Sequence, residues 1–203
     1  MAITGKYPGS RIRRWFDERF GKECYLCMRK SYELRISMYE FQKAVEDCLG
    51  NLLFFNEKEH RFLEDMESIC HTFRYLPEEI GECMRRIEAM DDLEEMLYVA
   101  NKIGAHANRL GNAIGAITGV DTDIPIILNP AARQIVQKPC GNLLKEMKIL
   151  YDKVYCFTSE AVPALEAYKQ AIDKAEAELL KPVSDLKNTS ESDTLEDYHV
   201  IKE

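Results

Sequence analysis

Small residues recur at helical spacing through the middle of the chain, and this pattern limits the fold more than any other feature. A row of apolar side chains lies beside them, as expected for a helix that packs on its neighbours. Each glycine inside a helix costs roughly 1 kcal/mol relative to alanine, and close approach by another helix would offset that cost. The pattern therefore predicts a helix–helix packing seam, within one chain or between two copies, formed by Ala100, Gly104, Ala107, Gly111 and Gly115.

Helical periodicity extends over almost the whole sequence, and no segment shows the alternation typical of a strand. With 203 residues the chain is long enough for one domain with a sizeable core. We therefore expect an all-α protein, an elongated antiparallel bundle of about five to six helices, several of them long and kinked. The expected parts are a basic amphipathic N-terminal helix segment at 1–21, the helical bundle at 22–181 and a disordered acidic tail at 182–203.

Capping residues predict where several helices begin. Asn56 and Asn129 are suitable N-cap residues, because an amide oxygen can accept a hydrogen bond from the first turn. Pro77 fits the first position of a helix, where a missing N–H is harmless. Asp91, followed three residues later by Glu94, predicts that a helix restarts after a break at this point.

Glycine and proline predict where helices end or bend. Gly21 is placed to end a first helix that begins near Ser10, and Gly119 to end the helix that contains the seam. Proline inside a helix removes a backbone hydrogen bond and produces a kink or a break. We expect an interruption at Pro139 and Gly141, a kink or a short break near Ser159–Pro163, and the end of the fold at Pro182.

Charge and cysteine usage narrow the class of protein. A net charge of −8 argues against nucleic acid as a partner, because phosphate binding depends on lysine and arginine. The charge is uneven, with basic residues in excess over 1–30 and acidic residues in excess over 182–203. Seven cysteines, an odd count, with no hydrophobic leader before them, predict reduced thiols in a cytoplasmic protein. Association with a membrane surface is an alternative location.

The N-terminal segment is a candidate surface for a membrane or a partner. Aromatic residues on one helical face with arginines around them are typical of a helix that lies on an anionic membrane or in a groove of another protein. The alternative is that this face folds back onto the bundle. The residues are Ile12, Trp15, Phe16 and Phe20, with Arg11 and Arg14.

A second candidate is an unusually apolar stretch that we expect to connect two helices. Connections are normally polar, whereas this one contains Ile124, Ile126, Ile127 and Leu128. It would either present an exposed hydrophobic hook to a partner or close over the helix ends as a lid.

The acidic end of the chain contains a short motif. Tyr198 and Ile201, preceded by acidic residues, resemble an LIR-type autophagy-receptor motif, a tyrosine-based endocytic sorting signal and a phosphotyrosine docking site. The resemblance implies binding of this segment as an added strand or a docked peptide.

Metal and catalytic signals are weak. Cys24 and Cys27 have the spacing of a zinc-binding pair, but a second close pair is missing. Glu57 and His60 match half of a di-iron motif, whose second half would fall in the expected tail. His106 lies within the apolar row, where a hydrogen-bonded histidine is the usual explanation. We expect no cofactor.

These observations favour a non-enzymatic helical scaffold or adaptor that acts through protein–protein interaction. It would self-associate as a homo-oligomer or dock a protein partner along its long, coiled-coil-like helices, and the tail would add a short linear motif. The first alternative is a peripheral membrane module that uses the N-terminal helix on an anionic surface. Others are a regulatory or effector protein that captures a cellular partner and, more remotely, a zinc or di-metal protein.

Overall fold

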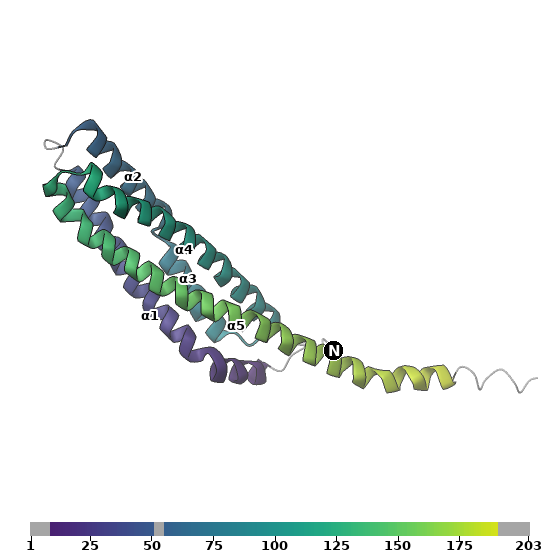
Figure 1. Cartoon of the computed structure of the whole chain (residues 1–203). Coiled ribbons are helices and arrows are strands. Elements are labelled where there is room, and N and C mark those ends of the chain that lie inside the picture. Colours follow the sequence, from purple (N-terminus) through teal and green to yellow (C-terminus); the bar gives the residue numbers. More distant parts are fainter. Residues whose placement is uncertain (1–8, 51–54, 191–203) are drawn as a thin grey trace, which may run out of the picture. The chain divides into compact units, whose positions relative to one another are not determined.

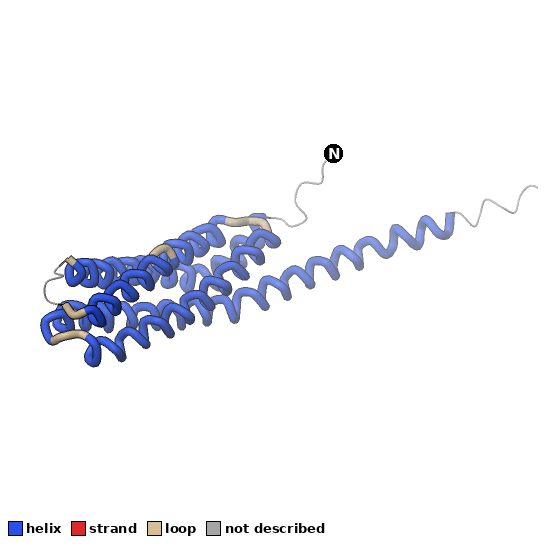
Figure 2. Tube along the Cα trace, turned by 90° about the horizontal axis from the view of Figure 1, so that it is seen from above, coloured by secondary structure: helices blue, strands red, loops and turns tan. Residues whose placement is uncertain are grey.

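The computed structural model describes the backbone of residues 9–50 and 55–190, and the side chains of 11–50 and 55–178. This part of the chain is helical and contains no strand, so the all-α prediction is confirmed (Figures 1 and 2). The helices are α1 (Gly9–Leu49), α2 (Glu57–Phe73), α3 (Leu76–Ala89), α4 (Leu93–Ile127) and α5 (Pro130–Ser190).

The chain divides into two units, residues 1–162 and residues 163–203. In the first unit α1 is antiparallel to the α2–α3 pair, in which α3 continues in the direction of α2 (Figure 1). Helix α4 returns antiparallel to that pair, and the first part of α5 is antiparallel to α4. The second unit is described by itself as a helix that extends to Ser190.

The inner face of α1 supplies much of the core of the first unit. Phe16 and Phe20 both meet Phe157 of α5 edge to face, with ring centroids 6.4 and 6.0 Å apart. Burying one such side chain contributes about 1.5–3 kcal/mol to folding. Buried side chains, all apolar except Ser31, recur along α1 every three or four residues, namely Ile12, Phe16, Phe20, Cys24, Cys27, Ser31, Leu34, Met38, Phe41, Val45 and Cys48.

The predicted helix starts agree closely with the structure. Asn56 caps α2 in a complete capping box with Glu59, and Asn129 accepts hydrogen bonds from the backbone N–H groups of residues 131 and 132. Pro77 lies in the first turn of α3. The break before α4 is also present, but its cap is Asp92, whose carboxylate accepts from two backbone N–H groups, rather than Asp91.

The predicted helix ends are wrong at several positions, because packing overrides the preferences of single residues. Helix α1 continues through Gly21, and α4 continues past Gly119 to Ile127. Helix α5 runs without interruption through Pro139, Gly141, Pro163 and Pro182. In α1 and α4 the buried row of side chains continues on both sides of the glycine, so the helix gains more from burial than the glycine costs. Residues 182–190, expected to be disordered, are helical.

One buried carboxylate joins two helix starts. Glu59 is buried near the beginning of α2, where its Oε2 accepts a hydrogen bond from the backbone N–H of Asn56 at 2.9 Å. Its Oε1 accepts a second bond, at 2.7 Å, from the backbone N–H of Asn129, the residue that caps α5. The same side chain therefore fixes the α2 start against the α4–α5 connection.

Candidate functional site

The small residues of the predicted seam occupy different environments. Ala100 and Ala107 are buried in the bundle. A Cβ atom added at Gly111 would lie 3.3 Å from Cε2 of Tyr151 in α5, whereas one added at Gly104 or Gly115 would meet nothing within 4 Å. In the described chain the glycines therefore do not mark an approach between two backbones, and the packing of this face depends on the alanines and on one tyrosine ring.

The apolar face of the N-terminal segment is covered by the bundle. Ile12, Phe16 and Phe20 are fully buried and Trp15 is half-buried, while Arg11 and Arg14 are exposed. The proposed membrane or partner surface is therefore not available, and the alternative, in which the segment folds back, describes the structure. The physical reason is that α1 does not end at Gly21, so its first turns continue the same buried row.

The expected apolar connector is the last turn of α4, which is a correction to the sequence-based prediction. Ile124 is buried, Pro125 lies inside the helix, and Leu128 is its buried C-cap residue. Of these apolar side chains only Ile126, at 72% exposure, points freely into solvent. The segment is neither a free loop nor a hook.

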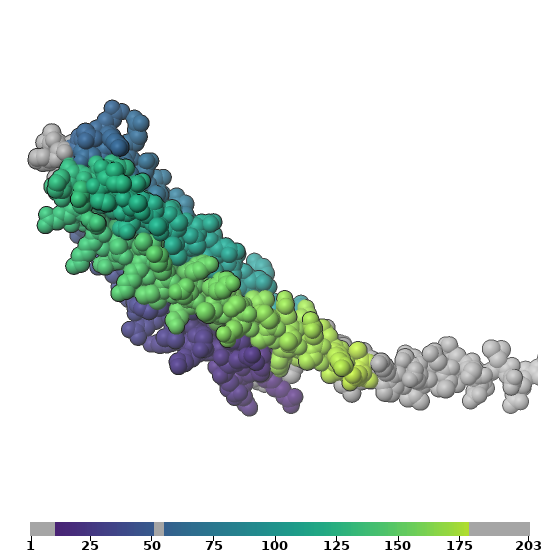
Figure 3. Space-filling model, viewed as in Figure 1, coloured from purple at the N-terminus to yellow at the C-terminus, as the bar shows by residue number. Residues whose placement is uncertain are grey.

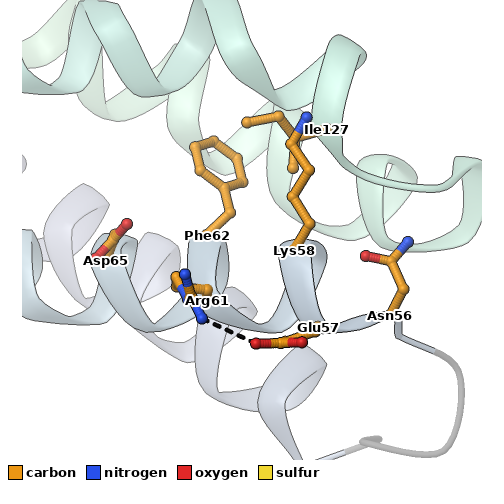
Figure 4. A pocket seen from close by; sticks show the side chains of 7 residues that line it. All are labelled: Asn56, Glu57, Lys58, Arg61, Phe62, Asp65 and Ile127. Atoms are coloured by element: carbon orange, nitrogen blue, oxygen red, sulfur yellow. Dashed lines mark hydrogen bonds and ion pairs between the residues drawn. The ribbon is translucent and has the colours of Figure 1, made fainter.

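Ile127 takes part in an open groove of about 570 Å³ along the first turns of α2 (Figure 4). Figure 4 shows Ile127 and Phe62 facing one another, with the Lys58 stem beside them. On the rim, Glu57 and Arg61 neutralise one another in an ion pair of 2.9 Å. The groove offers a small apolar floor and a mixed polar rim, and it specifies no ligand chemistry.

The cysteine pair consists of buried thiols. Burial raises the pKa of Cys27 to about 12, and it also raises the pKa of Cys24, so both stay protonated and are poor metal ligands at neutral pH. Among the described residues no group of three or more histidine, cysteine, aspartate or glutamate side chains is placed to hold a metal ion.

His106 lies at the wall of a second groove, of about 520 Å³, between α3 and α4. Its ring is buried, and Nδ1 lies 3.3 Å from the Arg109 guanidinium, which can only donate. Nδ1 also lies 3.6 Å from Oε2 of Glu79. Nε2 is buried and has no hydrogen-bond partner in the described part of the chain. Burial lowers the His106 pKa, Glu79 opposes this, and Arg109 and Lys102 add to it. The net effect favours the neutral form of the ring.

The most distinctive surface is the outer side of α1, opposite its buried face. Three tyrosines at seven-residue intervals point into solvent, Tyr25 at 61%, Tyr32 at 64% and Tyr39 at 67% exposure, and Ile36 is 44% exposed. With the basic residues between and after them they form a continuous helical row, which we call the outer stripe: Tyr25, Arg29, Tyr32, Ile36, Tyr39 and Lys43. In Figure 3 the α1 surface, purple to dark blue, forms one edge of the bundle.

The outer stripe has the composition of a protein interface. Tyrosine and arginine are enriched where proteins bind one another, because each supplies a large contact area together with polar groups. The three tyrosine hydroxyls form no hydrogen bond with the described residues, so their donors and acceptors are available to a partner. Helix α1 thus carries large side chains on two opposite faces, one apolar and one rich in tyrosine, and within the described chain only the apolar face is covered.

The apolar and aromatic residues of α1 fall into two groups: Phe41 and Val45 are buried, whereas Tyr32, Ile36 and Tyr39 are exposed. Both groups fit a helical period, and a single periodicity cannot separate two opposite faces. The offset between them was the available signal, because Leu34, Phe41 and Cys48 repeat every seven residues in a different register from Tyr25, Tyr32 and Tyr39. Tyr198 and Ile201 lie outside the described residues.

Comparisons with protein-family models, with curated proteins and with solved structures find no match to this chain. Among residues 9–50 and 55–190 no helix is both long and apolar enough to cross a bilayer.

Proposed function

We propose that the protein is a helical scaffold that binds other proteins through the outer stripe of α1. The observation that supports this is the row of three exposed tyrosines, spaced seven residues apart, on the side of α1 opposite its buried face. An amphipathic helix normally buries one face, and a second face rich in tyrosine in the same helix indicates a second packing partner.

Binding of other proteins, the function predicted from the sequence, is kept, but the binding surface is now the outer stripe and not the apolar face of the N-terminal segment. Protein–protein interaction as the activity, self-association and a cytoplasmic place of action stay as predictions. The peripheral-membrane alternative loses its main argument, because Phe16, Phe20 and Ile12 are buried. The linear motif at Tyr198 and Ile201 would be a separate, additional contact.

The test compares two sets of three tyrosine substitutions in the full chain. In the first, Tyr25, Tyr32 and Tyr39 are each changed to serine. In the control, three exposed tyrosines outside α1 are changed to serine, namely Tyr75, Tyr98 and Tyr155. Since all six side chains are more than half exposed, we expect both variants to keep the helical circular dichroism spectrum of the parent.

Binding is then measured by light scattering and by affinity capture with quantitative mass spectrometry. The proposal expects a complex, of the chain with itself or with a defined protein, that the parent and the control variant form and the outer-stripe variant does not. Identical masses and identical captured proteins for all three would disprove it.

A further inference from the structure

The outer side of α1 differs in charge from the rest of the protein. The whole chain carries a net charge of −8. Over the span of the outer stripe, from Tyr25 to Lys43, however, three exposed side chains are basic (Arg29, Arg35 and Lys43) and one is acidic (Glu40), while the next exposed charges along α1, Glu46 and Asp47, are acidic. Arg35 and Lys43 form no ion pair with any described residue, so their charges are not neutralised within the bundle. The surface that carries the tyrosines is therefore locally basic.

The spacing of the outer stripe selects a helix as its partner. Tyr25 and Tyr39 are separated by fourteen residues, which is about 21 Å at 1.5 Å per residue. The tyrosines repeat every two turns, and a partner helix with a heptad pattern presents its apolar residues at the same interval. A strand presents side chains on one face about every 6.8 Å, and this interval does not match the tyrosine row.

Basic residues accompany the tyrosine row on both sides. Arg35 lies to one side of the row and Arg29 to the other, and Lys43 continues its line toward the end of α1. In paired helices such flanking positions choose the partner by charge. Arg29 forms an exposed ion pair with Glu33 at 2.9 Å. Because exposed ion pairs contribute little to stability, Arg29 can leave Glu33 and pair with a carboxylate of the partner at little cost in free energy.

On these grounds we propose that the outer stripe binds an acidic amphipathic helix, which packs apolar heptad residues against Tyr25, Tyr32, Ile36 and Tyr39 and places carboxylates beside Arg29, Arg35 and Lys43. This inference rests on the proposed function and adds the chemistry of the partner. The tyrosines supply the contact area, and the basic residues select the charge.

A protein helix fits this surface better than an anionic membrane. Helices that lie on membranes insert large apolar residues such as Trp, Phe and Leu. Here the large apolar residues of α1 face the core, and the outer stripe contains one aliphatic residue, Ile36. Acidic Glu18 and Glu40 are also exposed on this side and would oppose an anionic lipid surface.

The experiment measures binding of the full chain to two synthetic helical peptides of about three heptads, both with leucine at the apolar positions. One has glutamate at the flanking positions and the other has lysine. Vesicles of phosphatidylcholine with phosphatidylserine are the third probe, and light scattering of the chain alone reports a second copy. Peptide binding is measured by fluorescence anisotropy at about 0.05 M and about 0.5 M salt. The Debye length is roughly threefold shorter at the higher salt concentration, so electrostatic attraction is weaker there.

The proposal expects the acidic peptide to bind and the basic peptide to bind at least about tenfold more weakly at low salt. Changing Arg35 and Lys43 to glutamate reverses this preference. In a matched control, Arg86 and Lys102 are changed to glutamate, which makes the same change of charge outside α1. This control should keep the preference for the acidic peptide.

Equal binding of both peptides, lost in the outer-stripe tyrosine variant, would overturn the acidic partner and leave the protein-binding function standing. Binding to vesicles alone, binding to neither peptide, or self-association that ignores the charge reversal would also overturn the acidic partner. If the tyrosine variant binds the peptides as the parent does, the outer stripe is not the docking surface and both proposals fail.

Discussion

Oε1 of Glu59 accepts a hydrogen bond of 2.7 Å from the backbone N–H of Asn129, seventy residues away in the sequence. The carboxylate is buried and also closes the capping box of α2 through Asn56. Local helix capping and long-range packing thus meet in one side chain. Two helix starts depend on its two oxygens.

Replacing Glu59 by glutamine should lower the free energy of unfolding by about 1–3 kcal/mol, because one oxygen becomes a donor that faces a backbone N–H. Urea denaturation followed by circular dichroism measures the change. The control is Glu57→Gln two residues earlier, where an exposed pair with Arg61 is worth no more than about 1 kcal/mol. Equal losses for the two variants would show that the Asn129 contact does not stabilise the fold.

Alanine at Gly104 and at Gly115 should each raise the free energy of unfolding by about 0.5–1 kcal/mol. A helical Cβ meets open space at both positions, so the variant gains helix propensity without a clash. Leucine at Gly111 should instead lower stability, because even a Cβ there lies 3.3 Å from the Tyr151 ring. Thermal unfolding at low protein concentration is the measurement, and a lower melting temperature for Gly104→Ala would contradict the open environment.

His106 should make the protein less stable as the pH falls. Burial is the main reason why the pKa of His106 in the folded protein is below its value near 6.5 in the unfolded chain. The unfolded chain therefore binds the proton more readily. Stability attributable to His106 is therefore complete above the unfolded pKa and declines as the pH drops from about 6.5 toward the lower folded pKa. Urea midpoints between about pH 7.5 and pH 5 measure this decline.

The variant His106→Gln cannot titrate and should show a shallower loss of stability over the same pH range. Glu79, Arg109 and Lys102 face the ring and stay unchanged, so the difference between the two profiles isolates the histidine. If stability changes with pH equally in the parent and in His106→Gln, the loss of stability at low pH does not come from His106.

Only one of the seven thiols should react rapidly in the native protein. Cys156 is exposed, whereas Cys24, Cys27, Cys48, Cys70, Cys83 and Cys140 are buried. Burial raises the pKa of Cys70 and of Cys140 to about 12, so their reactive thiolate form is scarce at neutral pH. Labelling with iodoacetamide and peptide mass mapping should find modification at Cys156 before urea is added and at all seven afterwards. Fast native labelling of Cys70 would contradict its packing.

Helix starts were predictable from sequence because a cap is local chemistry. Asn56, Asn129 and Pro77 act through hydrogen bonds, or a missing N–H, within one turn of their own position. Helix ends were not predictable at Gly21 and Gly119, since the outcome depends on burial against other helices that the local sequence does not reveal.

The outer stripe was missed for a different physical reason. Tyrosine is suited both to a core and to an interface, so helical spacing alone does not tell whether Tyr32 and Tyr39 are buried or exposed. Their exposure became evident only once Leu34, Met38 and Phe41 were seen to fill the interior. For Phe16 and Phe20 the sequence left two alternatives, a membrane or partner surface and a face folded back onto the bundle, and their burial agrees with the second.

Because α1 packs into the bundle on one face and exposes the outer stripe on the other, binding of a partner to the outer stripe is coupled to folding. A molecule that docks on Tyr32 needs α1 to be helical, and α1 is helical because Phe16, Phe20 and Phe41 are anchored in the interior. By mass action, a ligand present at a hundred times its dissociation constant would raise the free energy of unfolding by about 2.7 kcal/mol. A thermal-shift screen of candidate helices would therefore report occupancy of this face through the melting of the entire bundle.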